Sequence, residues 1–232
     1  MLTQEIIPDV YQLTSRGVNM FLIAEKELTL IDTGFYGSSA DVVEFIHGLG
    51  RSIHEMNLII ITHNHFDHTG GLAELRELTQ MLVAAHPAGI IDASKEPPDP
   101  GRMQRLLRIP FFFSLSKRFV LKAGDVDIQL NGGEVLKPLG GLEVIHTPGH
   151  TADSICLYSP EKKLLFVGDA LVRRRKSVLF PHKMVSSNLE QAVDSVKKMA
   201  ELDCDILCFG HGWPMTEDAH AIVAALAEKG QG

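Results

Sequence analysis

Three histidines and an aspartate lie within the six residues from 63 to 68, directly after a short apolar run. The run is Leu58 to Ile61, and the polar residues are His63, His65, Asp67 and His68. Imidazole nitrogens and carboxylate oxygens are ligands that divalent metals such as Zn²⁺ accept. A strand that ends in this loop would bring the side chains together, so the segment predicts a metal site at a strand end. The alternative, a solvated polar loop, is disfavoured by this density of histidine.

Three further candidate ligands follow apolar runs in the second half of the chain. They are His150 after residues 142–145, Asp169 after residues 164–167, and His211 after residues 206–209. Each run is predicted to be a buried strand that ends in a turn. A single histidine in this context is more often structural than metal-bound. Here the context repeats three times, and with the first cluster it supplies two full sets of ligands.

The order of these motifs resembles the metallo-β-lactamase superfamily over nearly the whole chain. The motifs are HxHxDH at 63–68, TPGHT at 147–151, GDAL at 168–171 and GHG at 210–212. The resemblance implies two metal ions: one held by His63, His65 and His150, one held by Asp67, His68 and His211, with Asp169 bridging both. It implies two zinc ions per chain, with iron or manganese as alternatives.

Two neighbouring residues receive other roles. Asp32, in the segment Leu30 to Gly34, resembles a motif at the end of an early strand in this family, where the carboxylate orients a ligand without binding metal. We expect His146 to be structural or to support a ligand. Asp67 is a candidate proton shuttle as well as a ligand.

The apolar periodicity predicts an α+β protein with strands and helices in both halves. Strands are expected near residues 10–14, 18–24, 27–32, 57–61, 81–85, 125–130, 134–136, 142–146, 153–158, 163–167 and 205–209. Helices are expected near residues 39–49, 70–79, 187–202 and 215–229. Two sheets packed face to face with helices outside, a four-layer αβ/βα sandwich, fit this order, and the family resemblance implies the same arrangement.

Composition and charge are those of one enzyme domain spanning residues 1–232. The chain has 232 residues, 45% of them hydrophobic, which is enough to bury a single large core. A formal charge of −7 argues against general binding to nucleic acid or to anionic membranes. There is no evident secretory signal and no apolar run of about 18 residues. Cys156, Cys204 and Cys208 lack CxxC spacing, so we expect reduced cysteines and a cytoplasmic protein.

Two segments have alternative interpretations. Arg173 to Lys176 is the one basic run; a solvated loop is the favoured interpretation, and an electropositive rim that attracts a substrate carboxylate or phosphate is the other. Residues 94–122 interrupt the pattern of strands and helices and contain Phe111-Phe112-Phe113. This insertion is predicted to cover the edge of the core, to form a lid over the metals, or to make a homodimer contact.

The predicted function is hydrolysis of a small ester, thioester or lactone, in which hydroxide formed from metal-bound water attacks the carbonyl. Val172 occupies the position where quorum-quenching lactonases of the family typically carry tyrosine, which disfavours that activity but leaves other lactones as candidate substrates. The helical domain that binds glutathione in the related thioesterases is not expected after His211. A mononuclear iron sulfur dioxygenase is the alternative enzyme. A non-catalytic metal-binding interaction protein is the alternative outside enzymes.

Overall fold

The computed structural model describes residues 1–90, 121–175 and 177–230. Within them, one sheet has seven strands in the order β1-β2-β3-β4-β5-β6-β7 and another has five in the order β14-β11-β10-β9-β8. The strands of the first sheet are β1 Leu2–Ile7, β2 Val10–Ser15, β3 Val18–Ala24, β4 Leu28–Ile31, β5 Met56–Ile60, β6 Leu82–Ala85 and β7 Ile128–Gln129. Those of the second are β8 Val135–Leu136, β9 Leu142–His146, β10 Ile155–Ser159, β11 Leu164–Gly168 and β14 Ile206–Phe209. The hairpin β12 Val172–Arg174 and β13 Ser177–Leu179 stands apart from both sheets.

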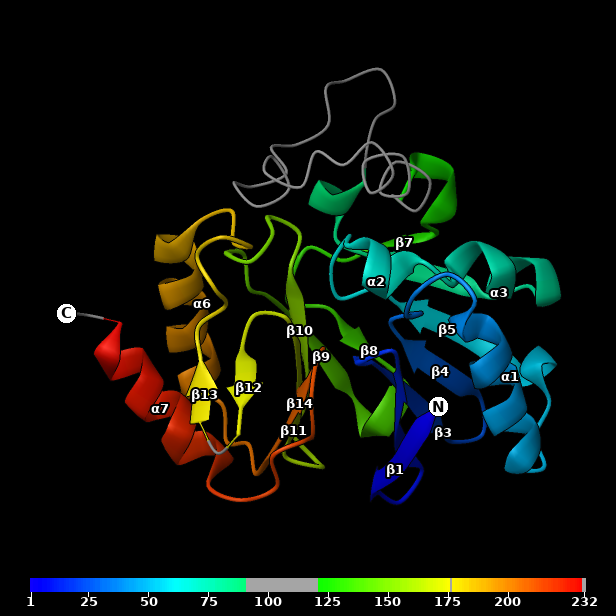
Figure 1. Cartoon of the computed structure of the whole chain (residues 1–232), viewed down its shortest axis with the longest axis horizontal. Helices are drawn as coiled ribbons and strands as arrows, with labels where there is room; N and C mark the ends of the chain where they lie inside the picture. Colours follow the sequence, from blue (N-terminus) through cyan, green and yellow to red (C-terminus); the bar gives the residue numbers. More distant parts are fainter. Residues whose placement is uncertain (91–120, 176, 231–232) are drawn as a thin grey trace.

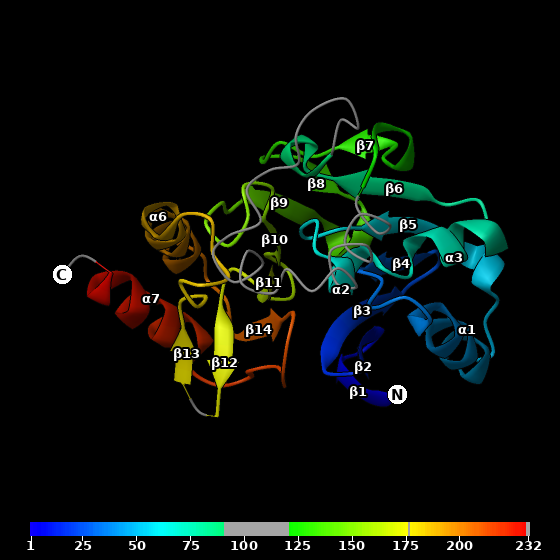
Figure 2. The same ribbon diagram turned by 45° about the horizontal axis from the view of Figure 1, so that its top comes forward.

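Helices cover the outer face of each sheet (Figure 1). The helices α1 Ser38–Gly48 and α3 Leu72–Leu78 lie on the first sheet, and α6 Leu189–Ala200 and α7 Ala219–Lys229 lie on the second. A single turn, α2 Phe66–Thr69, follows β5. Turns of 3₁₀ helix span Ile53–Glu55, Pro87–Gly89, Ala123–Asp125 and Pro138–Gly140. Figure 2, in which the molecule is turned, shows the sheets between the two pairs of helices.

Three hydrophobic clusters correspond to the three interfaces between these four layers. One joins the first sheet to α1 and α3, another joins the second sheet to α6 and α7, and the third joins the two sheets. Strand β3 shows why a sheet covered on both faces needs a continuous apolar run. Its Met20 and Leu22 face the helices, whereas Phe21 faces the other sheet, where its ring centroid lies 5.1 Å from that of Phe166. The αβ/βα sandwich predicted from the sequence is therefore confirmed.

Strand direction decides where the site forms. Strands β4, β5 and β6 are parallel to one another, so they end at one edge of the first sheet. Strand β11 is parallel to β14, and β9 has the same direction because both β9 and β11 pair antiparallel with β10. The loops after β5, β9, β11 and β14, which carry the candidate ligands, consequently meet across the two sheets.

Most of the predicted elements are present, and the differences have local causes. Strand β1 was not predicted because its pattern is largely exposed, and the hairpin β12–β13 was not predicted because it begins in a run of arginines. The strand expected at 125–130 is short, since Ala123–Asp125 forms a 3₁₀ turn before β7. The helix expected from 215 begins at Ala219. Residues 94–120 of the insertion lie outside the described residues.

Candidate metal centre

Three imidazole nitrogens converge at the end of β5. The Nδ1 atom of His65 lies 3.1 Å from the Nε2 atom of His63 and 3.1 Å from the Nε2 atom of His150. One proton cannot satisfy three facing nitrogens, whereas one cation can accept a lone pair from each. Burial, together with the neighbouring histidines, lowers the pKa of His63 well below its ordinary value and lowers that of His150 to about 4. Both rings are therefore neutral at pH 7, which is the form that binds metal.

A second group of ligand atoms lies beside the first. The Oδ2 atom of Asp67 is 3.8 Å from the Nε2 atom of His68 and 3.5 Å from that of His211. The Nε2 atom of His68 is fully buried and has no hydrogen-bond partner in the described part of the chain. An unpaired buried polar atom is costly, so its direction toward two carboxylates and a second imidazole fits a cation at this position.

Asp169 lies between the two groups. Its Oδ1 atom is 3.7 Å from His68 Nε2, and its Oδ2 atom is 3.6 Å from His150 Nε2 and 3.4 Å from His211 Nε2. Burial opposes the charge of this carboxylate, but His68 and the other nearby imidazoles hold its pKa well below the ordinary range. The geometry lets one ionised side chain contact ligands of both groups.

A further carboxylate and three hydrogen bonds determine which ring nitrogens face the centre. Asp32 Oδ2 accepts a hydrogen bond from His68 Nδ1 at 2.8 Å, and the two oxygens of Asp32 also accept from the backbone N–H and hydroxyl of Thr62. The Nδ1 atom of His63 lies 3.0 Å from the Thr62 hydroxyl, and that of His211 lies 2.9 Å from the carbonyl of Gly17. In each of these three rings Nδ1 is engaged by the supporting group, so Nε2 is the nitrogen that faces the candidate metal centre.

Sequence reasoning missed the contacts that support the loop between His63 and His65. The Oδ2 atom of Asp153 accepts from the backbone N–H of Asn64 at 2.7 Å, and the Asn64 side chain donates to the carbonyl of Gly89 at 2.6 Å. The only signal in the sequence is that Asp153 closely follows the TPGHT motif. These bonds tie the ligand loop to two other segments.

His146 lies outside these ligand groups. Its Nε2 atom lies 2.9 Å from the carbonyl of Ala152, and its ring stacks on His86 with centroids 4.0 Å apart. Its hydrogen bond holds the turn that follows His150.

A close backbone approach explains the glycine before His211. A Cβ atom on Gly210 would overlap Asp169 Oδ1 and would lie 2.9 Å from His68 Cε1. Any side chain at this position would therefore displace candidate ligands, and the GHG motif has a steric origin in this fold.

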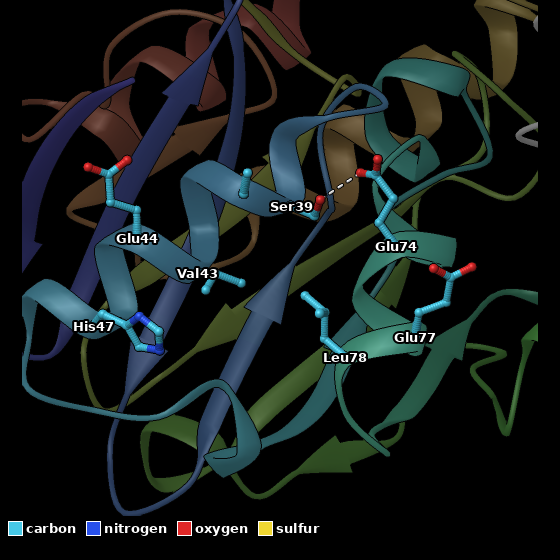
Figure 3. Close-up of a pocket in the computed structure, with 8 residues that line it drawn as sticks. Ser39, Val43, Glu44, His47, Glu74, Glu77 and Leu78 are labelled. Atoms are coloured by element: carbon cyan, nitrogen blue, oxygen red, sulfur yellow. Dashed lines mark hydrogen bonds between the residues drawn. The ribbon is translucent and has the colours of Figure 1, made fainter.

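A surface hollow elsewhere has a different character. It lies between α1 and α3, has a volume of about 530 Å³, and is lined by Glu44, Glu74 and Glu77 among others (Figure 3). Glu74 accepts hydrogen bonds from the Ser39 hydroxyl and the Gly37 N–H, which supports the start of α1. None of the seven candidate ligands lines this hollow. Its negative charge makes it unsuited to an anionic substrate.

Comparison with known proteins identifies the family. The model of the metallo-beta-lactamase superfamily matches residues 13–211. This chain belongs to that superfamily. It is an enzyme of the metal-dependent hydrolase type, and its relatives include proteins named as a probable metallo-hydrolase and an acyl-coenzyme A thioesterase. No helix in the described residues is long and apolar enough to cross a membrane.

Two relatives and one solved structure illustrate the similarity. The probable metallo-hydrolase YflN of Bacillus subtilis (strain 168) is 27% identical over 91% of this chain and 87% of its own length. The acyl-coenzyme A thioesterase MBLAC2 of Gallus gallus is 30% identical over 62% of this chain and 51% of its own length. The metallo-beta-lactamase family protein TTHA1429 of Thermus thermophilus has a TM-score of 0.70 at 22% identity, covering 97% of this chain and 79% of the other, which shows the shared fold.

Proposed function

We propose that this superfamily member is a dinuclear hydrolase of a small thioester, with other esters and lactones as the wider substrate class. The observation that carries the proposal is the pair of converging ligand groups. In each group the candidate ligand atoms all lie within 4.8 Å of one another, and Asp169 lies between the groups. His63, His65 and His150 would hold one ion. Asp67, His68 and His211 would hold the other, and Asp169 would contact both. Zinc suits this donor set of imidazole and carboxylate.

Two ions held here would polarise a carbonyl oxygen and make water acidic enough to act as a nucleophile near neutral pH. Hydrolysis forms a bond between the water oxygen and the acyl carbon and breaks the bond from that carbon to sulfur. The thiol leaves with a proton derived from the water. The carboxylate of Asp67 belongs to the second group and is 17% exposed, beside the accessible His211, so it is the candidate to carry this proton.

The cysteines do not supply an alternative nucleophile. All three are buried. Burial raises the pKa of Cys156 to about 12 and that of Cys204 to about 11, and it raises that of Cys208 further. Thiols with such pKa values stay protonated at neutral pH, so covalent catalysis by cysteine is disfavoured.

The environment of the two groups favours substrate entry beside His211. His63 and His150 of the three-histidine group are almost fully buried, whereas the His211 side chain in the second group is 39% exposed. We therefore expect a substrate to approach the centre beside His211, although His65 of the three-histidine group is also only half-buried. The name of the thioesterase relative supports thioesters among the candidate acyl substrates.

Metal analysis combined with thioester hydrolysis tests this function. We expect about two ions per chain, hydrolysis of acyl thioesters, and loss of both bound metal and activity in Asp169→Ala, because two cations without a bridging anion repel each other at short range. His146→Ala is the control and should keep its metal. Full activity in Asp169→Ala, or one iron per chain with oxygen uptake and no hydrolysis, would contradict the proposal.

A further inference from the structure

The arginine run lies in the hairpin that directly follows Asp169. Arg173 and Arg175 line a cavity of about 540 Å³, and Arg174 does not. The other lining residues are Gln4, Gly212, Trp213 and Pro214. Gly212 directly follows His211 in the chain, so one wall of the cavity is one residue away from the exposed member of the second ligand group. Figure 2 shows β12 between β13 and β14, next to the segment that follows His211.

Hydrogen bonds fix the shape of this cavity. The Arg173 Nη1 atom donates to the carbonyls of Trp213 and Pro214, and Nε donates to the carbonyl of Arg175 at 3.1 Å. These bonds hold the hairpin against the loop after His211. The Arg173 guanidinium therefore has a structural role. In the described part of the chain, the Arg175 guanidinium donates no hydrogen bond, so it is the arginine of the cavity that can bind a ligand.

Within the described residues, no carboxylate forms a salt bridge with the arginines of this cavity, or with Arg174. Trp213 adds an apolar face, since 56% of this residue is exposed. Guanidinium groups pair with phosphate oxygens through charged hydrogen bonds, and an exposed indole offers a stacking surface to an aromatic base.

We propose that this cavity binds the phosphate groups of the thiol carrier in the thioester substrate, a carrier of the phosphopantetheine type. The inference rests on the proposed function and names the leaving-group side of its substrate. Arg175 is six residues from Asp169, so the two lie at most roughly 20 Å apart. A carrier whose phosphates are joined to the thioester by an extended arm can span a separation up to this limit. If the carrier is a nucleotide, its base stacks on Trp213.

A binding titration tests the cavity without turnover. Trp213 is the single tryptophan of the chain, so tryptophan fluorescence, excited selectively over the three tyrosines, reports on this position alone. Using the metal-loaded protein, we expect saturable changes with coenzyme A and with phosphopantetheine, weakened by added salt. Tighter binding of coenzyme A, lost in Trp213→Ala titrated by calorimetry, would identify the nucleotide carrier. Equal affinities would identify the phosphopantetheine arm as the recognised part.

Matched variants separate the cavity from general charge. Arg175 has a φ of 55°, a conformation that asparagine tolerates, so Arg175→Asn removes the guanidinium with little backbone cost. We expect this variant to bind either ligand about tenfold to a hundredfold more weakly. Arg174→Asn removes the same charge from a residue outside the cavity and should change affinity far less. Equal weakening by both variants, or no binding by the wild type, would overturn the inference.

Kinetics distinguish this inference from the proposed function. The same acyl group is compared on coenzyme A and on N-acetylcysteamine, a thiol without phosphate. We expect Arg175→Asn to raise KM for the coenzyme A thioester about tenfold or more while kcat changes little, and to affect the phosphate-free thioester much less. Hydrolysis of both thioesters with no dependence on Arg175 would overturn the inference alone. Hydrolysis of neither would overturn the proposed function.

Discussion

At the scale of single residues, the centre depends on how each imidazole ring is oriented. His68 shows this most clearly, because Asp32 accepts from its Nδ1 atom and leaves Nε2 for the second group. Asp32 also accepts two hydrogen bonds from Thr62, which fixes the carboxylate itself. A residue outside the candidate ligand groups therefore sets the direction of one that is proposed to bind metal.

Asp32→Asn should consequently weaken metal binding without removing a ligand. The amide retains the size of the carboxylate but cannot accept with both atoms, so one of the bonds to Thr62 or His68 is lost. We expect about a tenfold to hundredfold loss of metal affinity, concentrated in the second ion. Titration of metal-free protein with Zn²⁺ against a competing chelator measures it. An unchanged affinity would show that Asp32 does not orient His68.

Metal binding should release protons from one group and not from the other. Burial opposes a charge on His68, but Asp32 and Asp169 outweigh it and raise the pKa of His68 to about 10. The pKa of His211 is also raised: burial opposes this shift, and its contact with Asp169 drives it. His63 and His150 have lowered pKa values and are neutral at pH 6. A cation must therefore displace a proton only in the second group.

Calorimetric titration with Zn²⁺ near pH 6, in buffers of different ionisation enthalpy, measures this release. We expect roughly one to two protons released with the second ion and close to none with the first. Below pH 6 the second ion should be lost before the first, since protons compete for its ligands more strongly. Asp32→Asn should reduce the release because it removes the charge that holds the His68 proton. Equal release with both ions would contradict the assignment.

At the scale of secondary-structure elements, the start of α6 positions the loop of His150. The carbonyl of Gly149 accepts from the N–H and the hydroxyl of the two residues before this helix, Asn188 and Ser187. A Cβ atom on Gly149 would lie 2.5 Å from the Cα atom of Ala192. The loop thus packs directly on the helix backbone, and only glycine permits that contact.

Gly149→Ala should therefore displace His150 and lower the affinity of the three-histidine group. Gly133→Ala is a matched control: Gly133 also has a positive φ, of 98°, but a Cβ atom there would meet nothing within 4 Å. Both variants carry backbone strain, on the order of 1 kcal/mol. Only Gly149→Ala should lose metal. Comparable metal content in the two variants, measured by elemental analysis, would show that the α6 contact does not position His150.

At the scale of the whole molecule, the site lies where the two sheets meet, so packing between them should support it. Phe166 is fully buried in the cluster between the sheets, beside Phe21. We expect Phe166→Ala to lower the free energy of unfolding by about 3–5 kcal/mol, because it leaves a cavity between the layers. Urea denaturation of the metal-free protein measures this loss. Val135→Ala, at a residue that is 64% exposed, should change it by less than about 1 kcal/mol.

The layered fold class and the convergence of the candidate ligands could be predicted from the sequence. Both rest on local features: an apolar run of four or five residues followed by His or Asp defines a buried strand and its end. The same reasoning failed for β1 and for the hairpin β12–β13. Their residues are mostly exposed or charged, and only pairing with a neighbouring strand makes them strands.

The contacts between ligands and their supports required the tertiary structure. Asp32 and His68, Asn64 and Asp153, and Arg173 and Trp213 are pairs separated by 36 to 89 residues and brought together by the fold alone. Side-chain periodicity carries information about a neighbour three or four residues away and none about a partner on another sheet. The cavity beside His211 therefore became visible only when the hairpin and the loop after β14 were placed together, because its walls come from three separate parts of the chain.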